Sequence, residues 1–302
     1  MDFEEQYFFS TTSHTSGLGV HTFDIINASG LAPSYEYLGY AGPVQEGAID
    51  LWGSDTLTEW TKLDQSPVLE RSGIRWATAI VQDGEVWLVA RNTYSKFHRG
   101  LNRLLTLNHN MPSSVIAPTG KMRLDLYHSE DGIDFEFVET VVSASDTGAK
   151  YNRNPFLWQN PETGNLGLVY YTENTGDGLE HLIHYREAAH PTQLEAATDT
   201  LLVEEADLVA APTLSYDDSA GQYCLWVEGV SDTGKWTTEL YRTASLSEKI
   251  TTDRHVIFDT NTACPFPHQT GNTDLLFVSH CTEPVQPGTV DAPWQGKLFA
   301  YQ

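Results

Sequence analysis

Two short segments of this chain, Arg75-Trp76 and Arg153-Asn154, carry the side chains best suited to holding a polar ligand. The guanidinium and amide groups donate hydrogen bonds that match hydroxyl or carboxylate oxygens, and the indole offers a flat apolar face to a sugar ring. Each assignment has a structural alternative, because Trp76 could pack between core elements and the two arginines could pair with buried acids. We predict that these four residues bind a ligand.

Three further residues, His268, Trp236 and Trp294, are predicted to contribute to binding. His268 belongs to a third segment of similar pattern, although a lone histidine is more often a hydrogen-bonded structural residue. Trp236 and Trp294 fall in predicted loops, residues 231–236 and 283–294, where an exposed indole is costly unless it contacts another molecule. The two tryptophans are therefore candidate interface residues.

Motifs of covalent, phosphate-binding or metal chemistry are missing from the sequence. No serine–histidine–acid order, phosphate loop or His-Glu-x-x-His pattern occurs. Cys224, Cys264 and Cys281 are too few for a disulfide framework and fit no zinc spacing, so buried free thiols are expected. The sequence predicts no metal site and no cofactor, and it leaves open whether an ion occupies the centre of the fold.

The elements that must position these residues form a repeat with a period of about 50 to 70 residues. In each unit a small or polar residue, often followed by proline, opens an apolar run that ends in a turn and leads into a β-rich segment. A second recurring element, a tight turn followed by a short apolar run, supplies the outer part of each unit. The clearest units begin at Ile74, Arg153, Ala211 and Cys264.

A repeat of this length built from strands is typical of a β-propeller. We therefore predict an all-β, five-bladed β-propeller that forms a single domain over residues 1–302. The N-terminal strand, residues 6–12, is predicted to close the ring as the outer strand of the last blade, since joining the first and last segments in one sheet removes an open seam. The predicted blades span residues 18–70, 74–142, 151–204, 209–258 and 263–302.

The 302 residues include 41 acids and 17 bases, a formal net charge of −24. So acidic a chain is poorly suited to nucleic acid or an anionic membrane, whose phosphates need lysine and arginine. The composition favours a protein of molar salt, where a Debye length of about 3 Å screens self-repulsion; an ordinary acidic mesophilic protein is the alternative. No run approaches about 18 apolar residues, and the acidic N-terminus lacks the features of a signal peptide.

One segment reverses this charge, because residues 86–124 contain no acid but 6 of the 17 bases. It includes a long loop insertion, residues 94–120, and loops of this length are usually functional or disordered. Its bases Lys96, Arg99 and Arg103 are predicted to contact an acidic surface or an anionic ligand, from the same face as Arg75 and Arg153.

Two units resemble those of five-bladed β-propeller glycoside hydrolases, family 43 above all: residues 154–158 (Asn-Pro-Phe-Leu-Trp) with 168–171 (Leu-Val-Tyr-Tyr), and residues 127–135 (Tyr-His-Ser-Glu-Asp-Gly-Ile-Asp-Phe). The resemblance extends over residues 18–302 and is one of repeat style. It implies three carboxylates at the inner-strand starts of blades one to three, acting as general base, orienting aspartate and general acid. Both proton transfers of glycoside hydrolysis need titrating groups, so neutral side chains cannot replace them.

Two of the three implied carboxylates are not where the resemblance places them. No aspartate lies near residues 75–78, and Asn154 stands before Pro155 where a glutamate is implied. Ala211 and Cys264 occupy the equivalent places in blades four and five. Asp24 is the candidate carboxylate of the first blade, catalytic only if the protein is an enzyme.

The predicted function is recognition by a non-catalytic, glycosidase-like propeller that binds carbohydrate or an acidic surface glycoprotein. A chain without an export signal fits a virion surface component of a virus of halophilic archaea, such as a capsid decoration, turret or tail fibre used for host attachment, with other virion subunits as partners. Extracellular and cytoplasmic locations are alternatives. The competing function is an active arabinanase- or xylosidase-like glycoside hydrolase of a halophile, and a third is a purely architectural particle protein. We expect no nucleic-acid partner and no membrane insertion.

Overall fold

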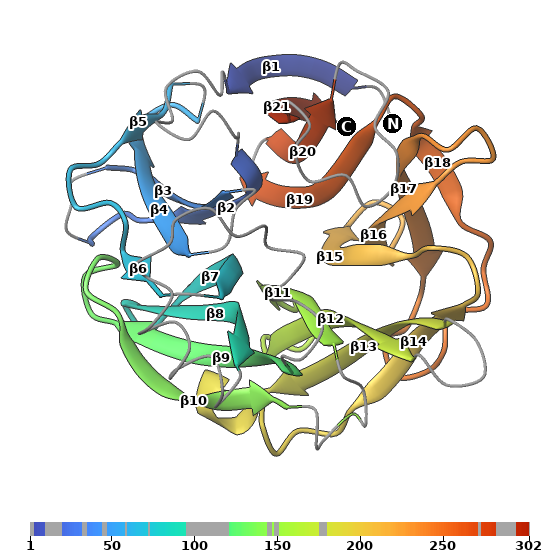
Figure 1. Ribbon diagram of the computed structural model, residues 1–302, viewed down its shortest axis with the longest axis horizontal. Helices are drawn as coiled ribbons and strands as arrows, with labels where there is room; N and C mark the ends of the chain where they lie inside the picture. The colour runs from blue at the N-terminus through green and yellow to red at the C-terminus, as the bar shows by residue number, and fades with distance from the viewer. Residues whose placement is uncertain are drawn as a thin grey trace, which may run out of the picture.

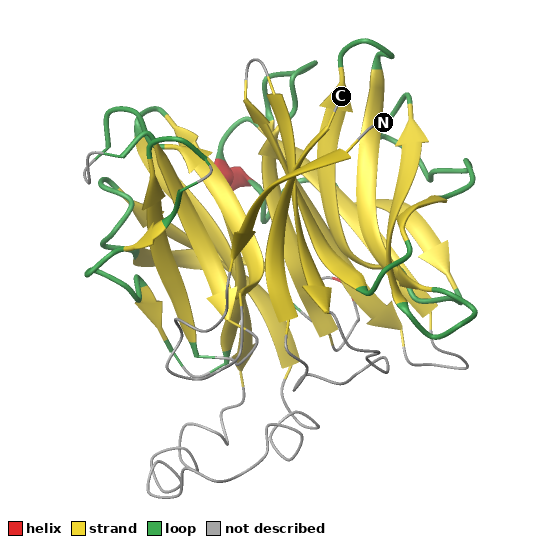
Figure 2. Ribbon diagram, turned by 90° about the horizontal axis from the view of Figure 1, so that it is seen from above, coloured by secondary structure: helices red, strands yellow, loops and turns green. Residues whose placement is uncertain are grey.

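Each repeat unit folds into an antiparallel sheet, and five such sheets stand around a central axis in a computed structural model of the chain (Figure 1). The structure describes residues 3–9, 20–31, 35–43, 47–57, 59–71, 73–94, 121–143, 147, 151–174, 180–270, 273–281 and 294–301. The strands run between the two faces of the ring (Figure 2). The prediction of an all-β, five-bladed propeller is confirmed.

The strands of the first four blades follow one another outward from the axis in chain order. Blade 1 contains β2 (Val20–Asn27), β3 (Tyr37–Pro43), β4 (Ala48–Ser54) and β5 (Thr61–Lys62), with β6 (Leu69–Glu70) also paired to β4. Blade 2 contains β7 (Ile74–Gln82), β8 (Glu85–Tyr94), β9 (Lys121–Ser129) and β10 (Glu136–Val142). Blade 3 contains β11 (Tyr151–Gln159), β12 (Leu166–Asn174), β13 (Glu180–Ala188) and β14 (Thr200–Glu205), the last preceded by the 3₁₀ helix η4 (Pro191–Gln193). Blade 4 contains β15 (Ala210–Asp217), β16 (Gln222–Val230), β17 (Trp236–Thr243) and β18 (His255–Phe258).

Blade 5 combines the two ends of the chain. Its inner strands are β19 (Thr262–Thr270), β20 (Thr273–Cys281) and β21 (Trp294–Tyr301), and its outer strand is β1 (Phe3–Phe9). The β1–β21 ladder runs from Phe3 opposite Tyr301 to Phe9 opposite Gly296. The N-terminal strand therefore lies a few residues earlier than the predicted residues 6–12, because a ladder pairs backbone groups and so extends through the acidic start of the chain.

Burial follows the position of a strand within its blade. The second strand β16 is buried at every residue except its two ends, because neighbouring blades cover both of its faces. The outer strand β10 exposes its first three residues to solvent. Aromatic side chains join the blades, and the Phe23 ring of blade 1 lies 5.6 Å from the Phe277 ring of blade 5.

A bulge near the start of the inner strand recurs from blade to blade. Trp76, Asn154, Ala211 and Cys264 all have left-handed backbone conformations, with φ between 48° and 52°. The pairing register of the inner strand shifts at each of these residues, and also at the start of β2 in blade 1. A non-glycine residue in this conformation costs about 1–2 kcal/mol, and a bulge turns its side chain out of the regular alternation. The recurring bulge therefore redirects the side chains of these residues beside the axis.

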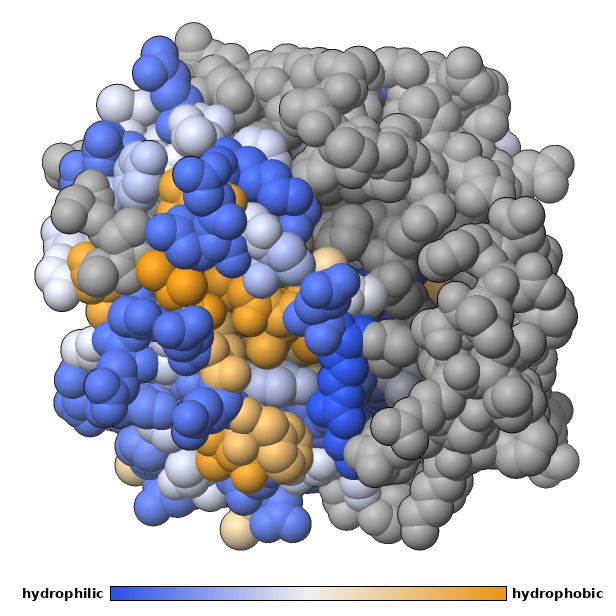
Figure 3. Space-filling model, turned by 60° about the vertical axis from the view of Figure 1, so that its left-hand side comes forward, coloured by the Kyte–Doolittle hydropathy of each residue, from blue (hydrophilic) through white to orange (hydrophobic). Residues whose placement is uncertain are grey.

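The outer surface mixes polar and apolar areas. Figure 3 brings blades 1 and 2 forward and shows hydrophobic patches interrupted by hydrophilic side chains. The large apolar side chains exposed in the described part of the chain are Phe137 and Val138 of β10 and Val256 of β18. Within the described residues, no helix is long and apolar enough to cross a bilayer.

Candidate binding site at the propeller axis

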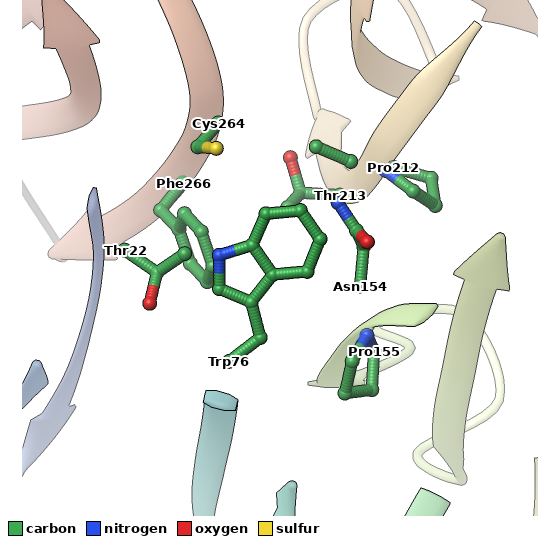
Figure 4. A pocket seen from close by; sticks show the side chains of 9 residues that line it. Thr22, Trp76, Asn154, Pro155, Pro212, Thr213, Cys264 and Phe266 are labelled. Carbon is green, nitrogen blue, oxygen red and sulfur yellow. The ribbon is translucent and has the colours of Figure 1, made fainter. Parts of the chain in front are cut away.

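A small pocket lies where the inner strands of the five blades converge (Figure 4). Its cavity volume is about 10 Å³, which is enough for one water-sized group. The pocket is lined by Thr22, Trp76, Asn154, Pro155, Ala211, Pro212, Thr213, Cys264 and Phe266. Four of these residues are the strained bulge positions, so the repeat itself builds the pocket.

Three buried polar side chains of the pocket have no hydrogen-bond partner within the described part of the chain. They are Thr22 through Oγ1, Asn154 through both amide atoms, and Thr213 through Oγ1. Their exposed fractions are 1%, 6% and 2%. An unsatisfied buried polar group costs about 1–3 kcal/mol, and such groups in native proteins usually meet a partner or water. The pocket is therefore chemically prepared to receive a polar group.

The Trp76 indole occupies the middle of the pocket (Figure 4). The residue is 9% exposed and belongs to the main hydrophobic core. Trp76 therefore packs between core elements, which was its structural alternative, and it also lines the pocket. The guanidinium carbons of Arg75 and Arg91 lie 5.3 and 5.9 Å from its ring centroid, within the range of cation–π attraction. The indole thus lines the pocket and also contacts a pair of cations.

A layer of charged residues lies one residue nearer the strand starts than the pocket. Arg75 of β7 stands directly opposite Arg91 of β8 in the ladder. Arg153 of β11 pairs with Glu173 of β12 at 3.2 Å and stacks over the Tyr151 ring at 4.6 Å. The predicted residues Arg75, Trp76, Arg153 and Asn154 are therefore brought together, whereas Arg91 and Glu173 come from second strands and were not predicted.

Glu228 of β16 is the buried carboxylate of this layer. It is 6% exposed and accepts hydrogen bonds from the Cys264 amide at 3.1 Å and the Cys264 thiol at 3.4 Å. Burial raises the pKa of Glu228, while these hydrogen bonds and the charges of Arg75 and Arg153 act in the opposite direction. The sequence signal for Glu228 was an acid directly after the apolar run 223–227 of a second strand, whereas the carboxylates implied by the resemblance stand at inner-strand starts.

Asp24 is held away from the lining of the pocket, between blades 1 and 2. Its Oδ2 accepts hydrogen bonds from the Thr78 hydroxyl at 2.8 Å and the Ala79 amide at 2.7 Å. The Thr78 hydroxyl in turn accepts from the Leu157 amide of blade 3 at 2.9 Å. Burial raises the pKa of Asp24 to about 7, and the hydrogen bonds only partly oppose that shift. The residue links three blades by one chain of hydrogen bonds.

His268 and Trp236 also differ from expectation. His268 lies four residues beyond the bulge of β19, outside the pocket, where burial lowers its pKa to about 4 and its ring meets Tyr37 edge-on at 6.2 Å. Trp236 is the first residue of β17 and packs, partly buried, against the main core, so its placement in an exposed loop was wrong. The Trp236 indole packs against apolar strands because strand pairing extends to this residue.

Several predicted residues fall at or beyond the limits of the described chain. Trp294 begins β21, so its assignment to a loop was also wrong. Lys96, Arg99 and Arg103 lie outside the described residues. The residues that flank the basic loop, Tyr94 and Lys121, pair with each other at the same face as the inner-strand starts. Within the described part of the chain, no group of His, Cys, Asp or Glu side chains is arranged to hold a metal ion.

No protein-family model and no curated protein matches the chain. Solved structures do share its fold. The endo-arabinase from Bacteroides thetaiotaomicron aligns with a TM-score of 0.66 at 12% identity over 97% of both chains. A thermostable family-43 glycoside hydrolase aligns with a TM-score of 0.65 at 11% identity, over 96% of this chain and 91% of its own.

Two further structures widen the comparison. The exo-β-1,3-galactanase from Phanerochaete chrysosporium aligns with a TM-score of 0.65 at 10% identity, over 100% of this chain and 65% of its own. The GH32 β-fructofuranosidase of Bombyx mori aligns with a TM-score of 0.63 at 14% identity, over 97% and 59%. The fold is thus the five-bladed propeller of glycoside hydrolases from families 43 and 32. Identities this low establish the architecture alone.

Proposed function

We propose that this protein is a recognition propeller that binds carbohydrate at its axial face and does not hydrolyse it. The single observation that carries the proposal is the buried pocket at the axis. Its Asn154 amide and two threonine hydroxyls have no hydrogen-bond partner among the described residues. Hydroxyl groups of a sugar satisfy such donors and acceptors, and the arginines above the pocket add further donors. The pocket lining includes no carboxylate among its described residues, which supports binding without the proton transfers of hydrolysis.

The test is a binding measurement paired with a turnover assay. Isothermal titration with arabinan, xylan and galactan oligosaccharides is expected to give saturable binding of at least one of them. Aryl-glycosides and the same oligosaccharides are expected to stay intact. Asn154→Ala is expected to weaken binding, and Thr243→Ala, a substitution at the outer end of β17, serves as the matched control. Failure of every saccharide to bind refutes the proposal.

The setting we propose is a particle surface in high salt. The support is compositional: a net charge of −24 and a basic segment on an otherwise acidic chain. A virion surface component of a halophilic archaeal virus unites these features. It would contact carbohydrate or an acidic surface glycoprotein of its host, together with neighbouring virion subunits. Immunogold labelling of purified particles and of host cells tests this location.

An active glycoside hydrolase is the second candidate, favoured by the buried Glu228. Its raised pKa suits a general acid, and Glu173 of the same charged layer is a second carboxylate. Turnover of an aryl-glycoside that disappears in both Glu228→Gln and Glu173→Gln establishes this candidate and overturns the non-catalytic proposal. Retained turnover in both variants excludes these two carboxylates.

A further inference from the structure

We propose that a cleft between blades 3 and 4, the interblade cleft, binds a small hydroxylated ammonium compound, of which a protonated amino sugar is an example. Its lining includes Glu162, Glu187, Thr200, Tyr223 and Ser247. The cleft is separate from the axial pocket, so the inference goes beyond the proposed function. It follows from the place of the cleft in the fold, the charge of its two carboxylates and the hydroxyl groups that complete its lining.

The interblade cleft lies on the face of the propeller opposite the axial pocket. Asn154 lines the axial pocket near the start of β11, whereas the β11–β12 turn, which follows the end of that strand, lines the cleft. Blade 3 also contributes the end of β13 and the start of β14. Blade 4, its neighbour in the ring (Figure 1), contributes the start of β16 and residues 244–247. The cavity volume is about 330 Å³, within the range of small-molecule sites.

The first carboxylate of the cleft, Glu162, is exposed and accepts hydrogen bonds from blade 4. The Tyr216 hydroxyl donates to it at 2.7 Å and the Tyr223 hydroxyl at 2.5 Å. These hydrogen bonds, that of Tyr223 above all, lower the pKa of Glu162 and so favour its ionised form. A carboxylate offers about four acceptor positions, so Glu162 can accept further hydrogen bonds from a ligand.

The second carboxylate, Glu187, is held by side chains of blade 3 alone. It accepts four hydrogen bonds of 2.6–3.0 Å, which come from Asn160, Thr163, Asn165 and Tyr185. Burial raises the pKa of Glu187, but these hydrogen bonds, led by that of Thr163, together outweigh burial and lower the pKa. Because its acceptor positions are filled, Glu187 contributes to the site through its charge.

Two negative charges therefore border the cleft without a cation beside them. The lining contains no lysine, arginine or histidine, and neither carboxylate forms an ion pair with another described residue. Neighbouring acids do have such partners: Asp199 pairs with Arg186 at 3.0 Å, and Asp217 pairs with Arg242 at 2.8 Å. A cleft lined by charge of one sign concentrates ions of the opposite sign, so the arrangement favours a cationic ligand.

Hydroxyl side chains complete the lining. They are those of Thr198 and Thr200 in blade 3 and of Ser245 and Ser247 in blade 4. The two serine oxygens lie 2.8 Å apart and pair with each other. A hydroxyl both donates and accepts, so these groups match the hydroxyls of a ligand whose ammonium group lies at Glu162. The lining therefore suits an ammonium compound that also carries hydroxyl groups.

Trp158 supplies an independent indication that a partner is missing. Its side chain is 7% exposed, and its indole N–H forms no hydrogen bond within the described part of the chain. The indole meets the Tyr223 ring of the lining edge-on, with the ring centroids 6.0 Å apart. Buried donors in native proteins usually meet a partner or an ordered water. A polar ligand in the cleft, or a water that the ligand holds, can supply that partner.

The experiment compares sugars that differ at one substituent, using the full-length protein and isothermal titration at pH 6, where a primary amine is protonated. The probes are D-glucosamine, N-acetyl-D-glucosamine and D-glucose, with methylammonium chloride and potassium chloride as the cations without a sugar. We expect glucosamine to bind at least about tenfold more tightly than either neutral sugar, which is the contribution of one hydrogen bond between charged groups.

Variants locate the effect. Glu162→Gln is expected to abolish the preference for glucosamine, because the amide keeps an acceptor for the tyrosines but carries no charge. Thr200→Val removes one hydroxyl at nearly constant shape and is expected to weaken glucosamine binding by about threefold. Asp83→Asn removes an equal charge from the exposed β7–β8 turn of blade 2, where asparagine tolerates the φ of 56°, and is expected to change nothing. Melting curves verify that each variant is folded.

Each remaining outcome overturns the inference. Equal affinity for glucosamine and the neutral sugars shows that the cleft does not select charge. Methylammonium or potassium binding as tightly as glucosamine shows that it attracts cations without recognising hydroxyl groups. A preference for glucosamine that survives Glu162→Gln places the ammonium group elsewhere on the protein. None of these results decides whether the axial pocket binds carbohydrate, because that proposal is tested through Asn154.

Discussion

The hydrogen bonds of Asp24 predict an unusual dependence of stability on pH. In Asp24→Asn, the amide oxygen can replace Oδ2 and accept from both the Thr78 hydroxyl and the Ala79 amide. The substitution therefore keeps the chain of hydrogen bonds that joins blades 1, 2 and 3. What it removes is the ability to ionise inside the fold.

The expected size follows from the pKa. Burial raises the pKa of Asp24 from 3.8 to about 7, so the native state binds this proton more tightly than the unfolded chain does. Stability from this group is fully present below pH 3.8 and is lost as the pH rises through about 7. Each pH unit within that window costs about 1.4 kcal/mol, so the whole window is on the order of 4 kcal/mol. About 3 kcal/mol of that loss falls between pH 5 and pH 8.

Urea unfolding of both proteins at pH 5, 6, 7 and 8 measures the effect. Other groups titrate as well, so the informative quantity is the difference in free energy of unfolding between the wild type and Asp24→Asn. We expect that difference to shift by about 3 kcal/mol in favour of the variant as the pH rises from 5 to 8. The exposed Asp253→Asn is the control for loss of one negative charge. A difference that stays constant with pH refutes the conclusion that burial raises the pKa of the Asp24 carboxyl group.

Three further predictions concern the core, the charge and the basic segment. Trp76→Ala is expected to lower the free energy of unfolding by about 3–5 kcal/mol because a buried indole is removed, and millimolar indole is expected to restore part of the melting temperature; a loss under about 1 kcal/mol contradicts the packing described. The melting temperature is expected to be lower in 0.1 M than in 2 M potassium chloride, since the charge of −24 then repels itself unscreened, and an equal or higher value at low salt rules out the halophilic interpretation. Replacing Lys96, Arg99 and Arg103 together by glutamate is expected to abolish association with cells or particles at an unchanged melting temperature, whereas collapse of the fold or unchanged association argues against an interface there.

The architecture was predictable because its signals are local and repeated. Strand, turn and strand recur with one period. In the units that begin at Arg153, Ala211 and Cys264, a small or polar residue near a proline marks the start of the inner strand. Inner strands of a propeller converge at the axis, so residues at equivalent places in the repeat meet there. The meeting of Trp76 and Asn154 in one pocket followed from the repeat alone.

What each side chain does in the site was decided by the tertiary structure. The period of two along a strand fails at a bulge, so the sequence could not say that Trp76 turns into the core or that Asp24 binds Thr78 of the next blade. Arg91 and Glu228 lie on second strands, far in sequence from the inner-strand starts, and reach the axis only through pairing register and blade packing. Local patterns specify strands and turns, whereas burial, charge and the partners of a carboxylate depend on contacts between residues distant in the chain.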